Sequence, residues 1–372
     1  MAYTFPENPQ PYTDKYFLRA NEILKAEGLN PFVRAQVFIR KGPGKTAGLD
    51  EAVAWLDRFS PLKENGGRVL ALPDSVSYTP KETQMVIEAR IQDIMELETT
   101  YLGIISAATT LANGGGDVDL SKVEATMHAV VEAAQGRAVS YFGARHWRWD
   151  KDAEIAVAAF KGGATSTSTD VGAALIGQKG MGTIPHALEN IYAWLSGKDT
   201  AVLESTKAFD RVIAPEIPRI ALIDYNNREI DDSLAVAREL GDRLYAVRVD
   251  TCGENVMQGA TLGDRKYWEG NGVSITGVAA LRKALNDEGF GNTKIVLSSG
   301  FADVEKVKAF VAAEQQYGLK LFGALGVGGV YPSRMATMDI VAVGERLDAM
   351  EPMSKVGRTY QPNPRLETRL GR

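Results

Sequence analysis

Cysteine is almost absent from this chain, because Cys252 is the only one among 372 residues. A single thiol excludes an intrachain disulfide and a zinc site built from several cysteines. Long apolar runs are missing too: no stretch approaches the roughly 18 residues that span a bilayer. The first ten residues are polar and contain proline, so they lack the apolar centre of a secretion signal. We expect a cytoplasmic protein without membrane contact.

Positive charge is also in deficit, with 42 Lys and Arg against 47 Asp and Glu and a formal net charge of −5. This balance argues against a broad surface for nucleic acid, while a local basic pocket for a small anion remains compatible with it. The hydrophobic share of 45% and the charged share of 24% are typical of globular enzymes. The length suggests about two domains.

Histidine is scarce, with three in the chain, and one of them stands in a distinctive context. His186 follows Gly180-Met181-Gly182-Thr183-Ile184-Pro185, and a helical pattern begins directly after it. Glycines permit a tight bend and proline fixes one backbone dihedral angle, so the imidazole projects from a defined backbone position. Such a histidine suits proton or phosphoryl chemistry near neutral pH, but it can also simply cap the helix.

The second half of the chain alternates short apolar runs with helical periods, which is typical of βα units around a parallel sheet. An irregular or complete α/β barrel fits this pattern better than a dinucleotide-binding sheet. A glycine triplet at 114–116 marks a domain edge. We predict an N-terminal α/β domain over 1–116, a barrel domain over 117–345 and a C-terminal tail over 346–372, which alternatively packs with the first domain. The predicted strands are 138–140, 220–223, 245–247, 295–297 and 321–324.

Each predicted strand ends in polar or glycine residues, and ligands bind at the carboxyl ends of parallel strands. After two of the strands, Ser298-Ser299-Gly300 and Gly326-Val327-Gly328 each border a predicted helix start, where free backbone amides can hold a phosphate. Ordinary left-handed turns are the alternative interpretation.

Charged and aromatic side chains occupy the other strand ends. Arg248 and Asp250 are two residues apart on one strand and so face the same side. Arg248 suits an anionic oxygen. Asp250 suits either ribose hydroxyls or a metal ion. Asp224, after the neighbouring strand, could share a divalent cation. Phe142 and Arg145 suit a flat aromatic acid, through stacking and a charged fork to its carboxylate.

Eight segments in order resemble motifs of nicotinate phosphoribosyltransferases, most closely the short type common in archaea and some bacteria. The resemblance covers roughly residues 12–358 and implies a split α/β N-terminal domain on an irregular, incomplete (β/α) barrel. The segments are 13–17, 98–102, 142–146, the glycine and Thr/Ser run at 162–169, 180–187, 248–251, and the glycine turns at 299–300 and 326–328.

The resemblance also implies a reaction: nicotinate takes the phosphoribosyl group of phosphoribosyl pyrophosphate, with ATP hydrolysis coupled through a phosphohistidine at His186. Mg²⁺ and ATP would be required, and a homodimer would bring Tyr16 across its interface. The implied residue roles are catalysis by His186 and Asp250; nicotinate binding by Tyr16, Phe142, Arg145 and Thr167; phosphoribosyl binding by Arg248, Ser299, Gly300, Gly326 and Gly328; and metal binding by Asp224 and Asp250.

Three alternatives stay open from the sequence: a nicotinamide or a quinolinate phosphoribosyltransferase, and a non-catalytic barrel that binds a phosphate ligand. Some relatives bind a carboxamide through an acidic residue in this region, and the run 165–169 has none. This favours a pyridine substrate that carries a carboxylate over one that carries a carboxamide. The segment 252–274 is expected to be a lid or a partner-contact loop. With one cysteine, the tail cannot form the zinc module that the archaeal type often carries.

Overall fold

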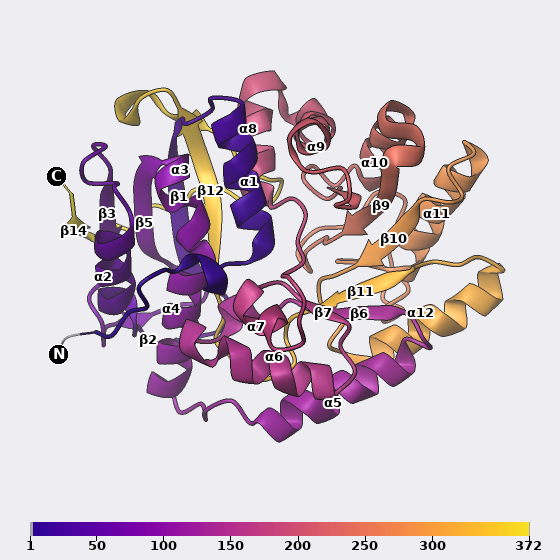
Figure 1. Ribbon diagram of the computed structural model, residues 1–372, viewed down its shortest axis with the longest axis horizontal. Helices are drawn as coiled ribbons and strands as arrows, with labels where there is room; N and C mark the ends of the chain where they lie inside the picture. The colour runs from indigo at the N-terminus through magenta and orange to yellow at the C-terminus, as the bar shows by residue number, and fades with distance from the viewer. Residues whose placement is uncertain (1–2, 372) are drawn as a thin grey trace.

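The computed structural model describes residues 3–371, which form two six-stranded sheets with helices around them (Figure 1). The first sheet is antiparallel and runs in the order β13-β12-β1-β5-β3-β14. Its strands are β1 (Phe32–Ile39), β3 (Arg68–Ala71), β5 (Thr83–Arg90), β12 (Ala336–Gly344), β13 (Glu351–Pro352) and β14 (Glu367–Leu370).

The second sheet is wholly parallel and forms an open half-barrel in the order β7-β6-β11-β10-β9-β8. This arrangement confirms the predicted incomplete barrel. Its strands are β6 (Ala138–Tyr141), β7 (Ser166–Thr167), β8 (Arg219–Leu222), β9 (Leu244–Val249), β10 (Lys294–Leu297) and β11 (Ala324–Val327).

Helices cover both sheets because their apolar stripes face them. In α12, for example, Val307, Phe310 and Val311 are buried whereas Lys308 is exposed. The helices are α1 (Lys15–Ala26), α2 (Leu49–Phe59), α3 (Ile91–Ile94), α4 (Glu98–Ala112), α5 (Leu120–Ala133), α6 (Asp152–Lys161), α7 (Asp170–Ala174), α8 (His186–Ser196), α9 (Ala201–Val212), α10 (Glu229–Leu240), α11 (Ile275–Asp287) and α12 (Val304–Tyr317).

The boundary between the two sheets differs from the predicted domains. β12 lies within the range 117–345 assigned to the barrel, but it pairs with β1 in the antiparallel sheet. The tail 346–372 supplies β13 and β14, and β14 pairs with β3. The antiparallel sheet therefore consists of strands from both ends of the chain, a non-local pairing that local patterns do not encode.

Three local features of the structure depart from the sequence pattern. The apolar pattern over 91–112 would fit one long helix, but a 3₁₀ turn at Met95–Leu97 separates α3 from α4. The strand predicted at 321–324 forms at Ala324–Val327 instead. The segment 42–46, which resembles an incomplete phosphate-binding loop, contains β2 (Gly44–Lys45), which pairs with β4 (Ser77–Tyr78). Within residues 3–371, no helix is both long enough and apolar enough to cross a membrane.

Gly103 sets how closely α4 approaches the segment that carries Arg145. A Cβ atom at this position would lie 2.2 Å from the carbonyl oxygen of Trp147. We expect Gly103→Ala to lower the free energy of unfolding by about 1–3 kcal/mol, because overpacking forces backbone shifts. Urea denaturation measures this change. Gly116→Ala is the control, since its Cβ would meet nothing within 4 Å; equal stability of the two variants would contradict the interpretation.

Candidate active site

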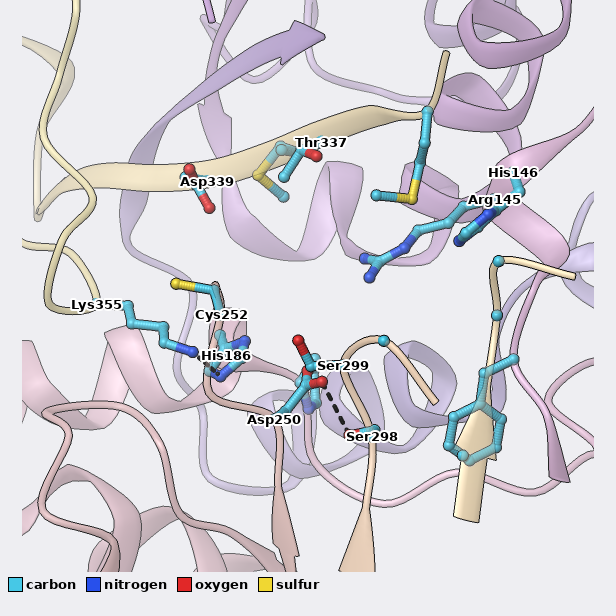
Figure 2. A pocket seen from close by; sticks show the side chains of 18 of the residues that line it. Arg145, His146, His186, Asp250, Cys252, Ser298, Ser299, Thr337, Asp339 and Lys355 are labelled. Carbon is cyan, nitrogen blue, oxygen red and sulfur yellow. Dashed lines mark hydrogen bonds between the residues drawn. The ribbon is translucent and has the colours of Figure 1, made fainter. Parts of the chain in front are cut away.

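A cavity of about 910 Å³ lies between the carboxyl ends of the parallel strands and the face of β12 (Figure 2). The parallel sheet contributes strand-end residues such as Arg248, Asp250 and Ser299. The opposite wall comes from the antiparallel sheet, including Thr337 and Asp339 of β12. Because both sheets line it, the cavity depends on how they pack together.

His186 is the first residue of α8, and its imidazole lines the cavity beside Lys355 (Figure 2). The buried ion pair of Lys355 and Asp224 holds the imidazole in place. Its Nε2 atom lies 2.9 Å from Oδ1 of Asp224 and 3.0 Å from Nζ of Lys355. Lys355 also donates to Oδ2 of Asp224. Asp224 is fully buried, whereas the His186 side chain is 29% exposed. The imidazole is thus fixed on one side and open on the other.

The charges of this group are set by burial and by each other. Burial would raise the pKa of Asp224, but Lys355 and His186 outweigh it and hold that pKa below its usual range. Burial lowers the pKa of His186, and the positive charge of Lys355 lowers it further against the pull of Asp224. Burial would lower the pKa of Lys355, but the negative charge of Asp224 raises it above its usual value. At neutral pH, a charged pair therefore supports a neutral imidazole, the form that acts as a nucleophile.

The loop before His186 packs closely against other elements, which explains its glycines. A Cβ atom at Gly182 would lie 2.5 Å from the backbone nitrogen of Tyr16, and one at Gly180 would lie 2.8 Å from the carbonyl carbon of Thr169. Arg19 of α1 donates to the carbonyl oxygen of Gly182. The glycines therefore bring His186 into a fixed position beside α1.

The ends of β9 and β10 carry groups suited to an anion and to a sugar. Arg248 and Asp250 both line the cavity, and the hydroxyl of Ser298 donates to Oδ1 of Asp250 at 2.8 Å. Ser299 and Gly300 have φ angles of 68° and 84° just before α12. A non-glycine residue in this strained conformation is common at functional sites. The turn at 299–300 lines the cavity, and its binding of an anion stays a prediction.

The second predicted glycine turn is different. Gly326 lies inside β11, and β12 rather than a helix is the next element, so no helix start borders Gly326-Val327-Gly328. A Cβ atom at Gly326 would lie 2.5 Å from the ring of Phe142, and one at Gly328 would lie 3.1 Å from Nε2 of His146. Both glycines leave room for those two rings and also line the cavity. The expected helix start beside them is wrong, and their binding of a phosphate stays a prediction.

Phe142, Arg145 and Tyr16, the residues predicted to bind a flat base, all line the cavity. Burial raises the pKa of the Tyr16 phenol, and its hydroxyl donates to Oδ2 of Asp14 at 3.1 Å. Tyr16 lines the cavity of its own chain, and its place across a dimer interface stays a prediction. Thr167, predicted to bind the base, is fully buried in β7 and does not line the cavity.

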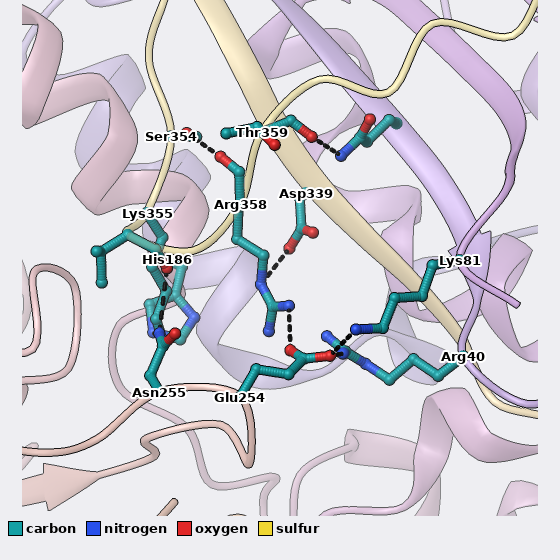
Figure 3. Close-up of polar contacts among 12 residues, drawn as sticks. Arg40, Lys81, His186, Glu254, Asn255, Asp339, Ser354, Lys355, Arg358 and Thr359 are labelled. Atoms are coloured by element: carbon teal, nitrogen blue, oxygen red, sulfur yellow. Dashed lines mark hydrogen bonds and ion pairs between the residues drawn. The ribbon is translucent and has the colours of Figure 1, made fainter. Parts of the chain in front are cut away.

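The start of the segment 252–274 forms one rim of the cavity through Glu254 (Figure 3). Its carboxylate contacts Arg40 at 2.5 Å, Lys81 at 2.5 Å and Arg358 at 2.8 Å. Burial would raise the pKa of Glu254, but these three cations lower it to about 2. The rim is consequently rich in positive charge, which Glu254 balances.

Sequence reasoning missed the contributions of the C-terminal tail and of the antiparallel sheet. Lys355 and Arg358 come from the tail, and Arg40 and Asp339 come from β1 and β12 or their ends. A lone lysine in an irregular segment gives no local signal, so only the folded chain identifies Lys355. Glu98 belongs to a segment that carries the family resemblance, yet it had no assigned role.

Comparisons with known proteins identify the fold. Neither a protein-family model nor a curated protein matches the chain significantly. The structure of nicotinate phosphoribosyltransferase from Porphyromonas gingivalis is 13% identical, covers 95% of this chain and 96% of its own, and has a TM-score of 0.67. The same enzyme from Vibrio cholerae is 14% identical over 93% and 87%, with a TM-score of 0.64. Nicotinate-nucleotide pyrophosphorylase from Pyrococcus furiosus is 27% identical over 96% and 82%, with a TM-score of 0.47.

Replacing Lys355 should change the ionisation of His186. In Lys355→Met, we expect the pKa of His186 to rise, because the positive charge 3.0 Å from Nε2 is lost. An NMR titration of the imidazole measures this shift towards higher pH. Lys308→Met, an exposed position on α12, should leave the titration unchanged. A His186 titration that is the same in the Lys355 variant, or moves to lower pH, would contradict the assigned contact.

Proposed function

We propose that this chain is a nicotinate phosphoribosyltransferase, which transfers phosphoribosyl from phosphoribosyl pyrophosphate to nicotinate in NAD biosynthesis. The observation that carries the proposal is the meeting, in one cavity, of a neutral His186, an anion turn at Ser299-Gly300 and a base subsite at Phe142 and Arg145. The fold shared with nicotinate phosphoribosyltransferases of two bacteria supports it.

In the proposed reaction, the ring nitrogen of nicotinate bonds to C1 of the ribose as the bond from C1 to the pyrophosphate oxygen breaks. Pyrophosphate leaves with the electron pair. Positive charge develops on the sugar, and the fixed carboxylate of Asp250 can stabilise it. Arg248 and the turn at 299–300 would bind phosphate oxygens, while Phe142 and Tyr16 stack on the pyridine ring.

A magnesium ion fits this cavity only with the help of substrate. Within residues 3–371, no three His, Cys, Asp or Glu side chains are grouped to hold a metal ion. Mg²⁺, however, commonly needs one or two carboxylates plus phosphate oxygens, and Asp250 supplies such a carboxylate. Asp224 does not fit this role, because Lys355 and His186 already occupy its buried oxygens. Bound Mg²⁺ would neutralise charge on the leaving pyrophosphate.

ATP enters the proposal through His186. A ring nitrogen of its neutral imidazole would bond to the γ-phosphorus of ATP as the bond from that phosphorus to the bridging oxygen breaks, and ADP would leave with the electron pair. The negative charge added to His186 would lie next to Lys355 and the cationic rim. Hydrolysis of this phosphohistidine could then alter the affinity for pyrophosphate in alternate phases of the cycle. A homodimer and a cytoplasmic location also stay proposals.

Quinolinate and nicotinamide are the competing bases, and a non-catalytic barrel is the competing class. Among the cations that line the cavity, Arg145 is proposed for the carboxylate of the base and Arg248 for a phosphate oxygen, so one cation is left for the base. One carboxylate suits this arrangement better than the two of quinolinate. Turnover with nicotinate, nicotinamide and quinolinate, each with and without ATP, separates all of these; no turnover with any base would favour the non-catalytic barrel.

The phosphohistidine is tested by labelling. Incubation of the wild-type protein with ATP labelled at the γ-phosphate should give an acid-labile protein-bound label, and His186→Ala should carry none. That variant should lose the stimulation by ATP while keeping some ATP-independent turnover. His128→Ala is the control, because His128 lies exposed on α5. Persistent label in His186→Ala would rule out the assignment.

The role of Arg145 is tested by truncation. Loss of a charged fork to a carboxylate costs about 1.5–3 kcal/mol, so Arg145→Ala should raise the KM for nicotinate about 10- to 100-fold. The KM for nicotinamide should change much less, since it lacks the carboxylate. Arg346→Ala, at an exposed position, is the control in steady-state kinetics. An unchanged KM in Arg145→Ala together with a raised KM in Arg248→Ala would transfer the role to Arg248.

A further inference from the structure

Glu98, the first residue of α4, has a buried carboxyl group at the wall of the cavity. The residue is 4% exposed and lines the cavity, and none of the side-chain hydrogen bonds found within residues 3–371 involves its carboxyl group. Its closest cation is Arg145, with Nη1 3.9 Å from Oε1, which is beyond hydrogen-bond distance. A buried polar group normally has a partner, so the arrangement leaves a place for one.

The position of this carboxyl group defines which partner it can take. Arg145 points into the cavity (Figure 2). Tyr16 and Phe142 line the same cavity. A base stacked on these rings with its substituent at Arg145 would bring that substituent next to Glu98. We propose that Glu98 is a specificity-determining residue of the base subsite, whose carboxyl group contacts the ring substituent that Arg145 binds.

This inference rests on the proposed function and adds a second group to base recognition. Burial raises the pKa of Glu98 to about 8, because it outweighs Arg145, and Asp14 and Asp339 add to the rise. The phenol of Tyr16 lies near enough for the charge of Glu98 to raise its pKa. Below pH 8, Glu98 is therefore neutral and can donate a hydrogen bond to the carboxylate of nicotinate. Above pH 8, it becomes an anion that repels a carboxylate and accepts from a carboxamide.

The ionisation of Glu98 sets the direction in which the preference for nicotinate over nicotinamide changes with pH. The ratio of kcat/KM for nicotinate to that for nicotinamide should fall by about tenfold or more between pH 7 and pH 9, because like charges placed together are strongly unfavourable. In Glu98→Gln, which keeps the size and the donor but cannot ionise, the ratio should stay constant to within about threefold over this range. A residue that only supported the fold would change kcat/KM for both bases in parallel.

The experiment compares wild-type protein, Glu98→Gln and the matched control Asp232→Asn. Asp232 is also a buried carboxyl group with a pKa raised by burial to about 7, but it lies on α10 and does not line the cavity. Its variant should keep the wild-type pH dependence. Steady-state rates with both bases are measured from pH 6.5 to 9.5, together with equilibrium binding of nicotinate by calorimetry.

The outcomes separate the two proposals. If the pH dependence of turnover or of binding is the same in wild type and in Glu98→Gln, the proposed role of Glu98 is wrong. The proposed reaction is then unaffected. Absence of nicotinate turnover, with nicotinate binding that loses its pH dependence in Glu98→Gln, would overturn the proposed reaction but support the recognition role. Absence of nicotinate binding at every pH would overturn both.

Discussion

The buried carboxylate of Asp224 is the constraint on which the site depends. A carboxylate without solvent is stable only when it is paired, and Asp224 has two partners, His186 and Lys355. These three residues come from the start of α8, the end of β8 and the C-terminal tail. The contact therefore joins distant parts of the chain at the point where the imidazole meets the cavity, and it leaves that imidazole neutral.

The two sheets provide different parts of the site. The parallel half-barrel presents Arg248, Asp250 and the turn at 299–300 at its strand ends, as parallel sheets commonly do. The antiparallel sheet closes the opposite side through β12 and brings Arg40 to the rim. The tail pairs with β12 and β3 and so returns Lys355 and Arg358 to the cavity. Anion binding and the ionisation of His186 thus depend on both ends of the chain.

Local patterns in the sequence predicted much of this arrangement. The alternation of β1, the βα rhythm and the polar strand ends at Arg248, Asp250 and Ser299 follow from periodicity and chain direction. Contacts between distant segments could not be predicted in the same way. The pairing of β12 with β1 and the approach of Lys355 have no local signature, and Gly326 was misplaced because β11 begins three residues later than its apolar run suggests.

The most direct test of the account is a crystal structure of the protein with nicotinate, phosphoribosyl pyrophosphate and Mg²⁺. The account predicts the pyridine ring between Phe142 and Tyr16 of the same chain, the 5′-phosphate at the turn formed by Ser299 and Gly300, and the pyrophosphate towards His186. Density for the ligands outside this cavity, or a pyridine ring stacked on a tyrosine of another subunit instead, would contradict it.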